Sequence, residues 1–349
     1  MKNCCIFFPI HGLRLGSAIG KEIRIDRVTL LAAEKIPHIR KRLGIVHPVS
    51  YYNKQHPPPY PRLFTAAATY ALIRSNRDPD QKDVWRERKA VQEALWILAA
   101  SLIGSKDRGR YHFSMRPYIG GKLYESVVIF EHKGPWAGGL LERMTPAEEY
   151  SLDQEWKAIM KRLFFPQLIR IVNGQVTVHP KWRQTIRQAA ILAGRSYLSR
   201  TVHDAFVSSM IAIETLLARR MDKFPDVLID RIVSLFGWLT DDELQPWSHL
   251  VKRLYSLRCS YVHDGKSGEI TGLDLYYADL LLFNILTNVC ENALTFRSKD
   301  DVIAFAERVR ARRVLGMPLR PKGPHLHFLG RGLSRADRQR IVDVSRWAW

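Results

Sequence analysis

The sequence predicts an α+β protein, in which a mixed α/β N-terminal domain is followed by an all-α helical bundle. Short β patterns with isolated helices occupy residues 1–177, whereas residues 178–312 carry an almost continuous helical pattern. The strands and helices of the first part do not alternate regularly, which favours α+β over a doubly wound parallel sheet. Residues 313–349, rich in arginine, proline and glycine, form a basic C-terminal tail.

The composition supports two folded domains and an anionic partner. Of the 349 residues, 46% are hydrophobic and 10% are aromatic, which is ample for two cores. Lysine and arginine (54) exceed aspartate and glutamate (34), so the net charge is +20. This excess predicts attraction to nucleic acid first and to an anionic membrane surface second. No run approaches the roughly 18 apolar residues of a membrane span, so we expect no membrane insertion.

The cysteines and the N-terminus indicate a reducing cytoplasm. The four cysteines have neither zinc-ligand spacing nor the pattern of a disulfide framework, so we expect no metal cofactor; they are Cys4, Cys5, Cys259 and Cys290. The apolar run "CCIFFPI" is interrupted by Pro9 and His11, and no small-residue cleavage pattern follows it. We therefore interpret this run as a buried strand and not as a signal peptide.

The elements of the N-terminal domain follow from local patterns. Predicted strands cover residues 4–15, 22–31, 62–73, 110–115 and 125–133, and residues 56–62 ("HPPPYPR") form a polyproline-like connector. A helix with a charged start and an apolar finish is expected over residues 80–103. A second helix is expected over residues 153–165, ending before Pro166.

Four amphipathic helices make up the predicted bundle. The first starts at the capping pair Thr201 and Asp204 within residues 200–220. The others cover residues 225–237, 245–265 and 271–296. Short connections between such helices are typical of a bundle. In the third helix, the apolar stripe consists of Leu250, Leu254, Leu257 and Tyr261, and Gly265 is the expected C-terminal cap.

The end of that third helix, "LRCSYVHDG", carries the candidate chemistry. Arg258 and His263 are separated by four residues, which places them roughly 140° apart on an ideal helix. Both reach one phosphate only if the helix end unwinds before Gly265 or if the pair works across a dimer. The helix C-terminus stabilises a protonated imidazole. On spacing alone, a capping histidine beside a solvated arginine explains the pair more simply.

A carboxylate on the first bundle helix favours a functional role for Arg258 over that of a solvated arginine. Glu214 has Met210, Ile211, Leu217 and Ala218 at its i±3 and i±4 positions, so it lies on an apolar face. A buried carboxylate needs a partner. We expect that partner to be Arg258 or Arg253. The alternative is that Glu214 lies at the edge of the apolar stripe and reaches water.

The segments "AIETLLARR" and "LYSLRCSYVHDG" resemble a HEPN domain, in particular its Apea-like branch, over residues 199–296. Such domains are helical bundles with an Arg-x4–6-His motif, and many are metal-independent ribonucleases of toxin–antitoxin or anti-phage systems. Arg258 and His263 match that motif with four intervening residues. In many members a polar amide or acid follows the arginine, whereas this chain has Cys259.

The resemblance implies a chemistry and a set of partners. RNA carries its own nucleophile, the 2′-hydroxyl, so no cofactor is needed. His263 would transfer the proton and Arg258 would neutralise the phosphate during transesterification, leaving a 2′,3′-cyclic phosphate. The supporting residues would be Glu214, Cys259, Ser260 and Asp264. Two copies of the chain would form the site as a homodimer, and the N-terminal domain would bind an antitoxin or a phage-derived trigger.

Two other functions remain open from the sequence. A non-catalytic HEPN-like interaction module is favoured by Cys259. A metal-dependent DNA nuclease of the PD-(D/E)xK kind would use Glu131 and Lys133, after the apolar strand "SVVIF", with Asp107 as an upstream ligand. A strand that simply leaves the core into a charged turn explains this last pattern more simply.

Overall fold

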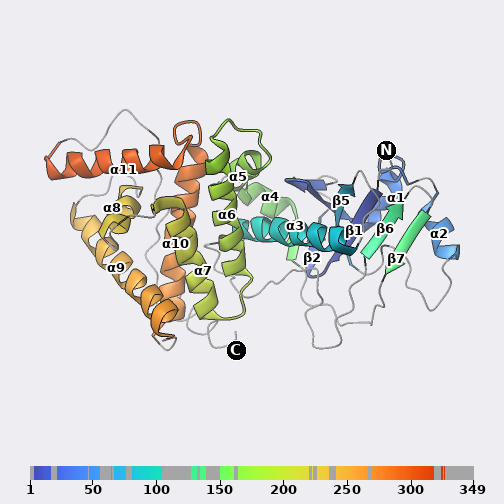
Figure 1. Ribbon diagram of the computed structural model, residues 1–349, viewed down its shortest axis with the longest axis horizontal. Coiled ribbons are helices and arrows are strands. Elements are labelled where there is room, and N and C mark those ends of the chain that lie inside the picture. Colours follow the sequence, from blue (N-terminus) through green and yellow to red (C-terminus); the bar gives the residue numbers. More distant parts are fainter. Residues whose placement is uncertain are drawn as a thin grey trace. The chain divides into compact units, whose positions relative to one another are not determined.

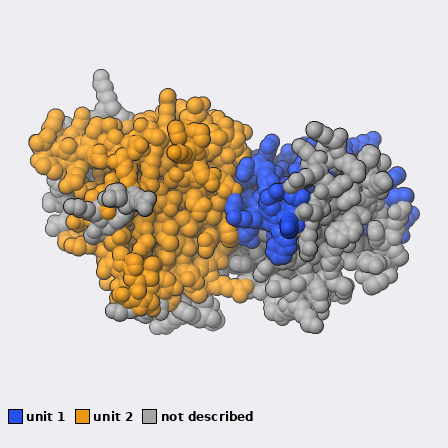
Figure 2. Space-filling view, in the orientation of Figure 1, with its two compact units in different colours: residues 1–95, 110–159 blue, residues 96–109, 160–349 orange. Residues whose placement is uncertain are grey.

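The computed structural model confirms an α+β protein, with an N-terminal sheet region followed by a helical region (Figure 1). It describes residues 4–16, 22–45, 47–55, 64, 67–75, 81–103, 127–131, 134–138, 150–160, 164–219, 222, 226–235, 241–265, 269–317, 324 and 326. Internal contacts define two units, coloured in Figure 2. Unit 1 comprises Met1–Leu95 and Arg110–Ile159, and unit 2 comprises Trp96–Gly109 and Met160–Trp349.

An antiparallel six-stranded sheet organises unit 1, in the order β3-β4-β5-β1-β6-β7. Its strands are β1 (Cys4–Ile10), β3 (Glu22–Ile25), β4 (Val28–Ala32), β5 (Thr69–Ser75), β6 (Val127–Glu131) and β7 (Gly134–Gly138). A separate parallel pair joins β2 (Leu13–Leu15) to β8 (Tyr150–Leu152). Two short helices, α1 (Ile36–Ile39) and α2 (Val49–Gln55), follow β4 along the chain.

The central strand β1 confirms the buried-strand interpretation of the N-terminus. All seven of its residues are buried. Cys5 and Phe7 belong to a core cluster that includes Tyr70 of β5, and Phe7 meets the ring of Phe64 edge-on with centroids 5.0 Å apart. Because alternate residues of a strand face opposite sides, burial along the whole strand means that both faces of the sheet are covered at β1.

Three of the predicted strands differ in detail from the observed ones. The first, residues 4–15, divides into β1 and β2, because Gly12 takes a left-handed backbone (φ 75°) between them. The segment 22–31 folds as a hairpin, because Asp26 takes a left-handed backbone (φ 56°) and reverses the chain between β3 and β4. The third predicted strand, residues 62–73, begins only at Thr69. Phe64 also has a left-handed backbone (φ 61°), which ends any extended run there. The predicted strand 110–115 and the connector 56–62 lie outside the described residues.

The first predicted helix is confirmed and the second is corrected. Helix α3 (Gln81–Ala99) continues into a 3-10 turn, Ala100–Leu102. The second helix is shorter than predicted, since α4 covers Gln154–Met160. Pro166 does not terminate it but lies in the first turn of a new helix, α5 (Phe165–Val172). A proline is favourable there because the first turn leaves its N–H groups unpaired anyway.

Among the described residues, unit 2 contains the four predicted bundle helices and three more. The predicted four are α7 (Val202–Leu217), α8 (Asp226–Ser234), α9 (Asp241–Asp264) and α10 (Gly272–Glu291). The additional ones are α5, α6 (Pro180–Tyr197) and α11 (Lys299–Val314). Helix α7 packs against both α6 and α10, and it lies beside them in Figure 1. Because α11 extends to Val314, the predicted tail 313–349 begins inside a helix.

Side-chain caps begin α7, α10 and α11, and those at Thr201 and Thr271 follow the pattern of the sequence. The Thr201 hydroxyl accepts a hydrogen bond from the Asp204 N–H at 3.2 Å and so begins α7. Thr271 and Asp274 form a reciprocal capping box at α10, and Ser298 and Asp301 form another at α11. No helix of the described residues is long and apolar enough to cross a membrane.

Two features hold the helices of unit 2 together: a series of buried side-chain hydrogen bonds, and the close approach of Gly194 to the backbone of Trp96. The Ser209 hydroxyl on α7 lies 2.8 Å from Asp279 Oδ1 on α10 and 2.7 Å from Ser196 Oγ on α6. On α6, Gly194 lies against the backbone of Trp96, where a Cβ atom would be 1.7 Å from the Trp96 carbonyl oxygen. Only glycine therefore allows this approach.

Candidate functional site

The segment with Arg258 and His263 is the last part of an unbroken helix. Helix α9 continues through Asp264. Gly265 then takes a left-handed backbone (φ 68°) and donates its N–H to the Tyr261 carbonyl at 3.1 Å, which confirms it as the cap. The helix does not unwind before Gly265. Within one chain, Arg258 and His263 thus stay roughly 140° apart around the helix axis.

Glu214 of α7 is paired with Arg258. Arg258 Nη2 donates to Glu214 Oε2 at 2.9 Å, and the two side chains are only 18% and 17% exposed. Arg253, the other expected partner, instead donates from Nε to Asp274 Oδ1 at 3.1 Å. Burial raises the pKa of Glu214, although the charge and the hydrogen bond of Arg258 oppose that change.

This ion pair leaves one donor and one acceptor unused. Arg258 Nε and Glu214 Oε1 are buried without a hydrogen-bond partner in the part of the chain that the structure describes. Buried polar groups are nearly always satisfied, so such atoms at a candidate site indicate a place for a ligand or for water. A guanidinium bound through a single Nη2 contact retains donors for a phosphate oxygen.

Cys259 and Ser260, predicted as supporting residues, lie half-buried on α9. The pKa of Tyr255 is raised to about 12, chiefly by burial, and also by the hydrogen bond to the Cys259 thiol and the charge of Glu214. Sequence reasoning missed Tyr255. Its i,i+4 spacing from Cys259 was the available signal. The thiol therefore has a phenol as its neighbour, next to the Glu214–Arg258 pair.

His263 and Asp264 are exposed at the end of α9, beside Val262, which is 47% exposed although apolar. The predicted site thus has two parts. Arg258, Glu214 and Cys259 are half-buried and contact one another or Tyr255, whereas His263 and Asp264 face solvent. An exposed imidazole is accessible to a large substrate or to a second protein chain.

Two aromatic residues that sequence reasoning did not assign to the site flank this helix end. The rings of Tyr261 and His203 are stacked, with centroids 5.9 Å apart and planes inclined by 12°. The Tyr261 hydroxyl donates to Asp204 Oδ1 at 3.3 Å. Leu254 and Leu257 of the predicted apolar stripe are buried, whereas Tyr261 is partly exposed. Burial and the nearby Asp204 raise the pKa of Tyr261.

The last turns of α9 therefore contact α7 at two separated points. Tyr261 bonds Asp204 near the start of α7, and Arg258 bonds Glu214 near its end. These two α7 residues are about 15 Å apart by the rise of 1.5 Å per residue. Tyr261 and Arg258 thus reach in opposite directions along α7, which fixes how the end of α9 lies against it.

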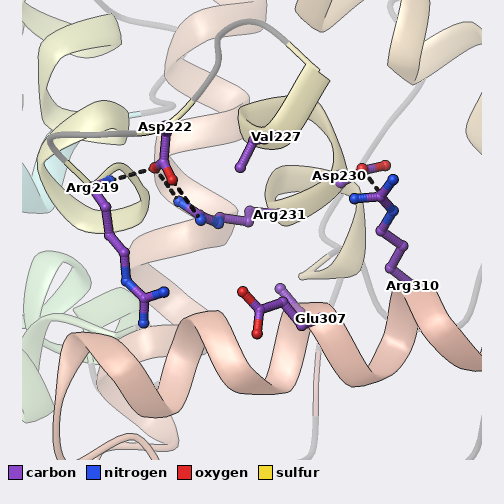
Figure 3. A pocket seen from close by; sticks show the side chains of 8 residues that line it. Arg219, Asp222, Val227, Asp230, Arg231, Glu307 and Arg310 are labelled. Carbon is purple, nitrogen blue, oxygen red and sulfur yellow. Dashed lines mark hydrogen bonds and ion pairs between the residues drawn. The ribbon is translucent and has the colours of Figure 1, made fainter.

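A polar cavity of about 330 Å³ lies where the α7–α8 connection meets α11 (Figure 3). Arg231 donates from Nη2 to Asp222 Oδ1 at 3.0 Å, and Arg310 pairs with Asp230 at 3.2 Å. Three arginines and three carboxylates line the cavity in all: Arg219, Arg231, Arg310, Asp222, Asp230 and Glu307. Their charges balance, and the ion pairs already join α8 to its neighbours, so we interpret this cavity as structural.

The remaining metal-dependent alternative falls largely outside the described residues. Glu131 ends β6, but Asp107 and Lys133 are not among the residues described. Within the described ranges, no group of three histidine, cysteine or acidic side chains is arranged to hold a metal ion.

Comparison of the chain with protein-family models, with curated proteins and with solved structures gives no match.

Proposed function

We propose that this protein is a metal-independent endoribonuclease of the HEPN type, acting as a toxin or an anti-phage effector in the cytoplasm. One observation carries the proposal. Glu214 of one bundle helix holds Arg258 at the end of another, while Arg258 Nε has no partner among the described residues and His263 is exposed one turn further on. The end of α9 thus carries both a phosphate-binding cation and a proton-transfer group, on different sides of the helix.

Each group has a defined role in RNA cleavage. Arg258 binds a non-bridging phosphate oxygen and stabilises the charge that develops there. A histidine takes the proton of the 2′-hydroxyl, or protonates the departing 5′-oxygen. The 2′-oxygen bonds to phosphorus as the P–O5′ bond breaks, which leaves a 2′,3′-cyclic phosphate and a 5′-hydroxyl. Glu214 keeps Arg258 in place throughout.

The separation of Arg258 and His263 around α9 favours a site shared by two copies of the chain. In a homodimer, Arg258 of one copy would act with His263 of the other. Val262 supports this assembly, because it exposes an apolar side chain directly before His263. The net charge of +20 favours RNA as the partner. The N-terminal unit would bind the antitoxin or phage-derived trigger.

The test uses the full-length protein with single-stranded RNA and with DNA, each with and without EDTA. The variants are Arg258→Ala and His263→Ala. Arg253→Ala is the matched control, because Arg253 lies on the same helix and is also paired with a carboxylate. We expect EDTA-resistant RNA cleavage to cyclic-phosphate ends, reduced about 10²- to 10⁴-fold in His263→Ala. The rate of RNA cleavage should fall by a comparable factor in Arg258→Ala. Arg253→Ala should cleave RNA as fast as the wild type does.

Mixing the two inactive variants tests the shared site. Half of randomly mixed dimers pair one chain of each variant and contain one intact site of two, so about a quarter of the activity should return. No recovery from a mixed dimer would contradict the shared site.

Two outcomes would contradict the proposal itself. EDTA-sensitive DNA cleavage unaffected by either variant would indicate a metal-dependent nuclease. A folded dimer that cleaves neither substrate would indicate a non-catalytic interaction module, which the Cys259–Tyr255 contact in place of a polar amide or acid favours.

A further inference from the structure

The stacked pair of His203 and Tyr261 lies at the end of α9, where Tyr261 is one turn beyond Arg258 and on the same side of the helix. His203 is in the first turn of α7, and Tyr261 is in the last turn of α9, two residues before His263. Their planes are inclined by only 12°, and both side chains are partly exposed. Because the two rings are stacked on each other and partly exposed, a further planar ring can extend the stack on an outer face.

Hydrogen bonds hold this surface in position before any ligand binds. The Tyr261 hydroxyl donates to Asp204 Oδ1 at 3.3 Å, and the Thr201 hydroxyl donates to Asp204 Oδ2 at 2.7 Å. Asp204 is in turn anchored through its own N–H, which donates to Thr201. The phenol ring is therefore fixed at its hydroxyl end as well as at its backbone. Preorganised rings lose little conformational freedom when they bind a ligand.

The chemistry of these rings selects a nucleobase. Every base has a flat π face, and the bases of single-stranded RNA are free to stack on tyrosine or histidine, whereas those of a duplex are already stacked on one another. Both oxygens of the exposed Asp204 carboxylate accept hydrogen bonds, Oδ2 from the Thr201 hydroxyl and Oδ1 from the Tyr261 hydroxyl.

We infer that the His203–Tyr261 pair is a nucleobase-binding subsite, which stacks a base of single-stranded RNA beside the bond to be cleaved. The inference rests on the proposed ribonuclease function and adds the part of the substrate that is recognised. According to this inference, the preferred substrate is unpaired RNA with a base that stacks on the His203–Tyr261 pair. Recognition by stacking alone tolerates all four bases.

Binding measurements on a chain that does not cleave test the subsite separately from the chemistry. The full-length His263→Ala protein is titrated, by fluorescence anisotropy, into a labelled single-stranded RNA and into an oligomer of the same length without bases. His203→Ala and Tyr261→Leu are each added to this background. Both should bind the intact RNA about tenfold more weakly, and the baseless oligomer as before. Tyr261→Phe should retain the affinity, because it retains the ring.

Tyr277→Leu is the matched control. Tyr277 is also partly exposed and contacts an aromatic ring, that of Trp247, which lies about 24 Å back along α9 from His263. This variant should bind both oligomers as its parent does.

The outcomes separate the subsite from the ribonuclease proposal. Unchanged affinity of folded His203→Ala and Tyr261→Leu proteins for intact RNA overturns the subsite, as does an equal loss on both oligomers. If wild type does not cleave RNA but the base-dependent loss is found, the subsite stands and the ribonuclease proposal fails. If wild type cleaves while these variants bind normally, only the subsite fails.

Discussion

Arg258 Nη2 donates a 2.9 Å hydrogen bond to Glu214 Oε2 and thereby joins the last turns of α9 to the end of α7. The contact is a single one, and Arg258 Nε and Glu214 Oε1 remain without partners within the described residues. Glu214 thus positions the guanidinium but does not occupy it fully. The position of the proposed phosphate-binding group therefore depends on a second helix.

Glu214→Gln should weaken RNA cleavage without abolishing it. Glutamine keeps the shape and one acceptor but removes the charge that holds Arg258, and misplacing a substrate-binding group by about 1 Å costs up to about a hundredfold in rate. We expect kcat/KM to fall about ten- to a hundredfold. Glu307→Gln, a change of an exposed carboxylate on α11, is the control. An unchanged kcat/KM for Glu214→Gln would show that the ion pair does not position Arg258.

The same variant should change how stability depends on pH. The pKa of Glu214 is raised in the folded protein because burial disfavours its charge. A raised carboxyl pKa contributes stability that is fully present below the unfolded-state pKa and is lost as the pH rises through the folded-state pKa. Relative to Glu214→Gln, the wild type should therefore lose stability as the pH rises from the ordinary glutamate pKa of about 4.3 through the raised folded-state pKa. Urea denaturation across this range measures the difference, and an opposite slope would mean that Arg258 outweighs burial.

The site was predictable from sequence where it depends on one helix, and unpredictable where it depends on two. An acidic residue among apolar neighbours showed that Glu214 needs a partner, and helical spacing showed the angle between Arg258 and His263. Whether Arg253 or Arg258 pairs with Glu214 depends on how α9 crosses α7, which no local pattern encodes. The contact of His203 with Tyr261 arises from the same crossing.

The fold shows the same division. The α+β class, the buried strand β1 and the caps at Thr201 and Thr271 follow from local composition. Helix α11 has a weak apolar stripe among many charged residues. Its sequence therefore did not predict a helix that continues to Val314. Pro166 was interpreted as ending a helix, but proline is also favourable in a first turn, and only the neighbouring packing decides between the two.

Asp222→Ala should strongly destabilise unit 2. Arg231 is only 7% exposed, and it pairs with Asp222 while Nη1 donates to the Leu217 carbonyl at 2.6 Å, at the end of α7. Removing the carboxylate leaves a buried cation without its counter-charge, which costs about 3–5 kcal/mol. The control is Asp230→Ala, since its partner Arg310 is 58% exposed and such surface pairs contribute below about 1 kcal/mol. Equal losses of unfolding free energy in the two variants would contradict the structural role given to Arg231.

Gly194→Ala should be among the most damaging single-methyl changes in the chain. The added Cβ would lie 1.7 Å from the Trp96 carbonyl oxygen and 2.4 Å from its carbonyl carbon, both backbone atoms that a side-chain rotation cannot move. Helix α6 would have to move away from Trp96, and with it the Ser196 hydroxyl that bonds Ser209 of α7. We expect a loss of at least about 3 kcal/mol in unfolding free energy, at the upper end of overpacking costs.

Gly265→Ala separates this steric effect from the general effect of losing a glycine. Gly265 has a left-handed backbone (φ 68°), but its added Cβ would meet nothing within 4 Å. The change should therefore cost only the conformational preference, about 1 kcal/mol. Urea denaturation of both variants measures the two losses. If Gly194→Ala loses no more unfolding free energy than Gly265→Ala does, then α6 does not approach Trp96 as closely as this structure shows.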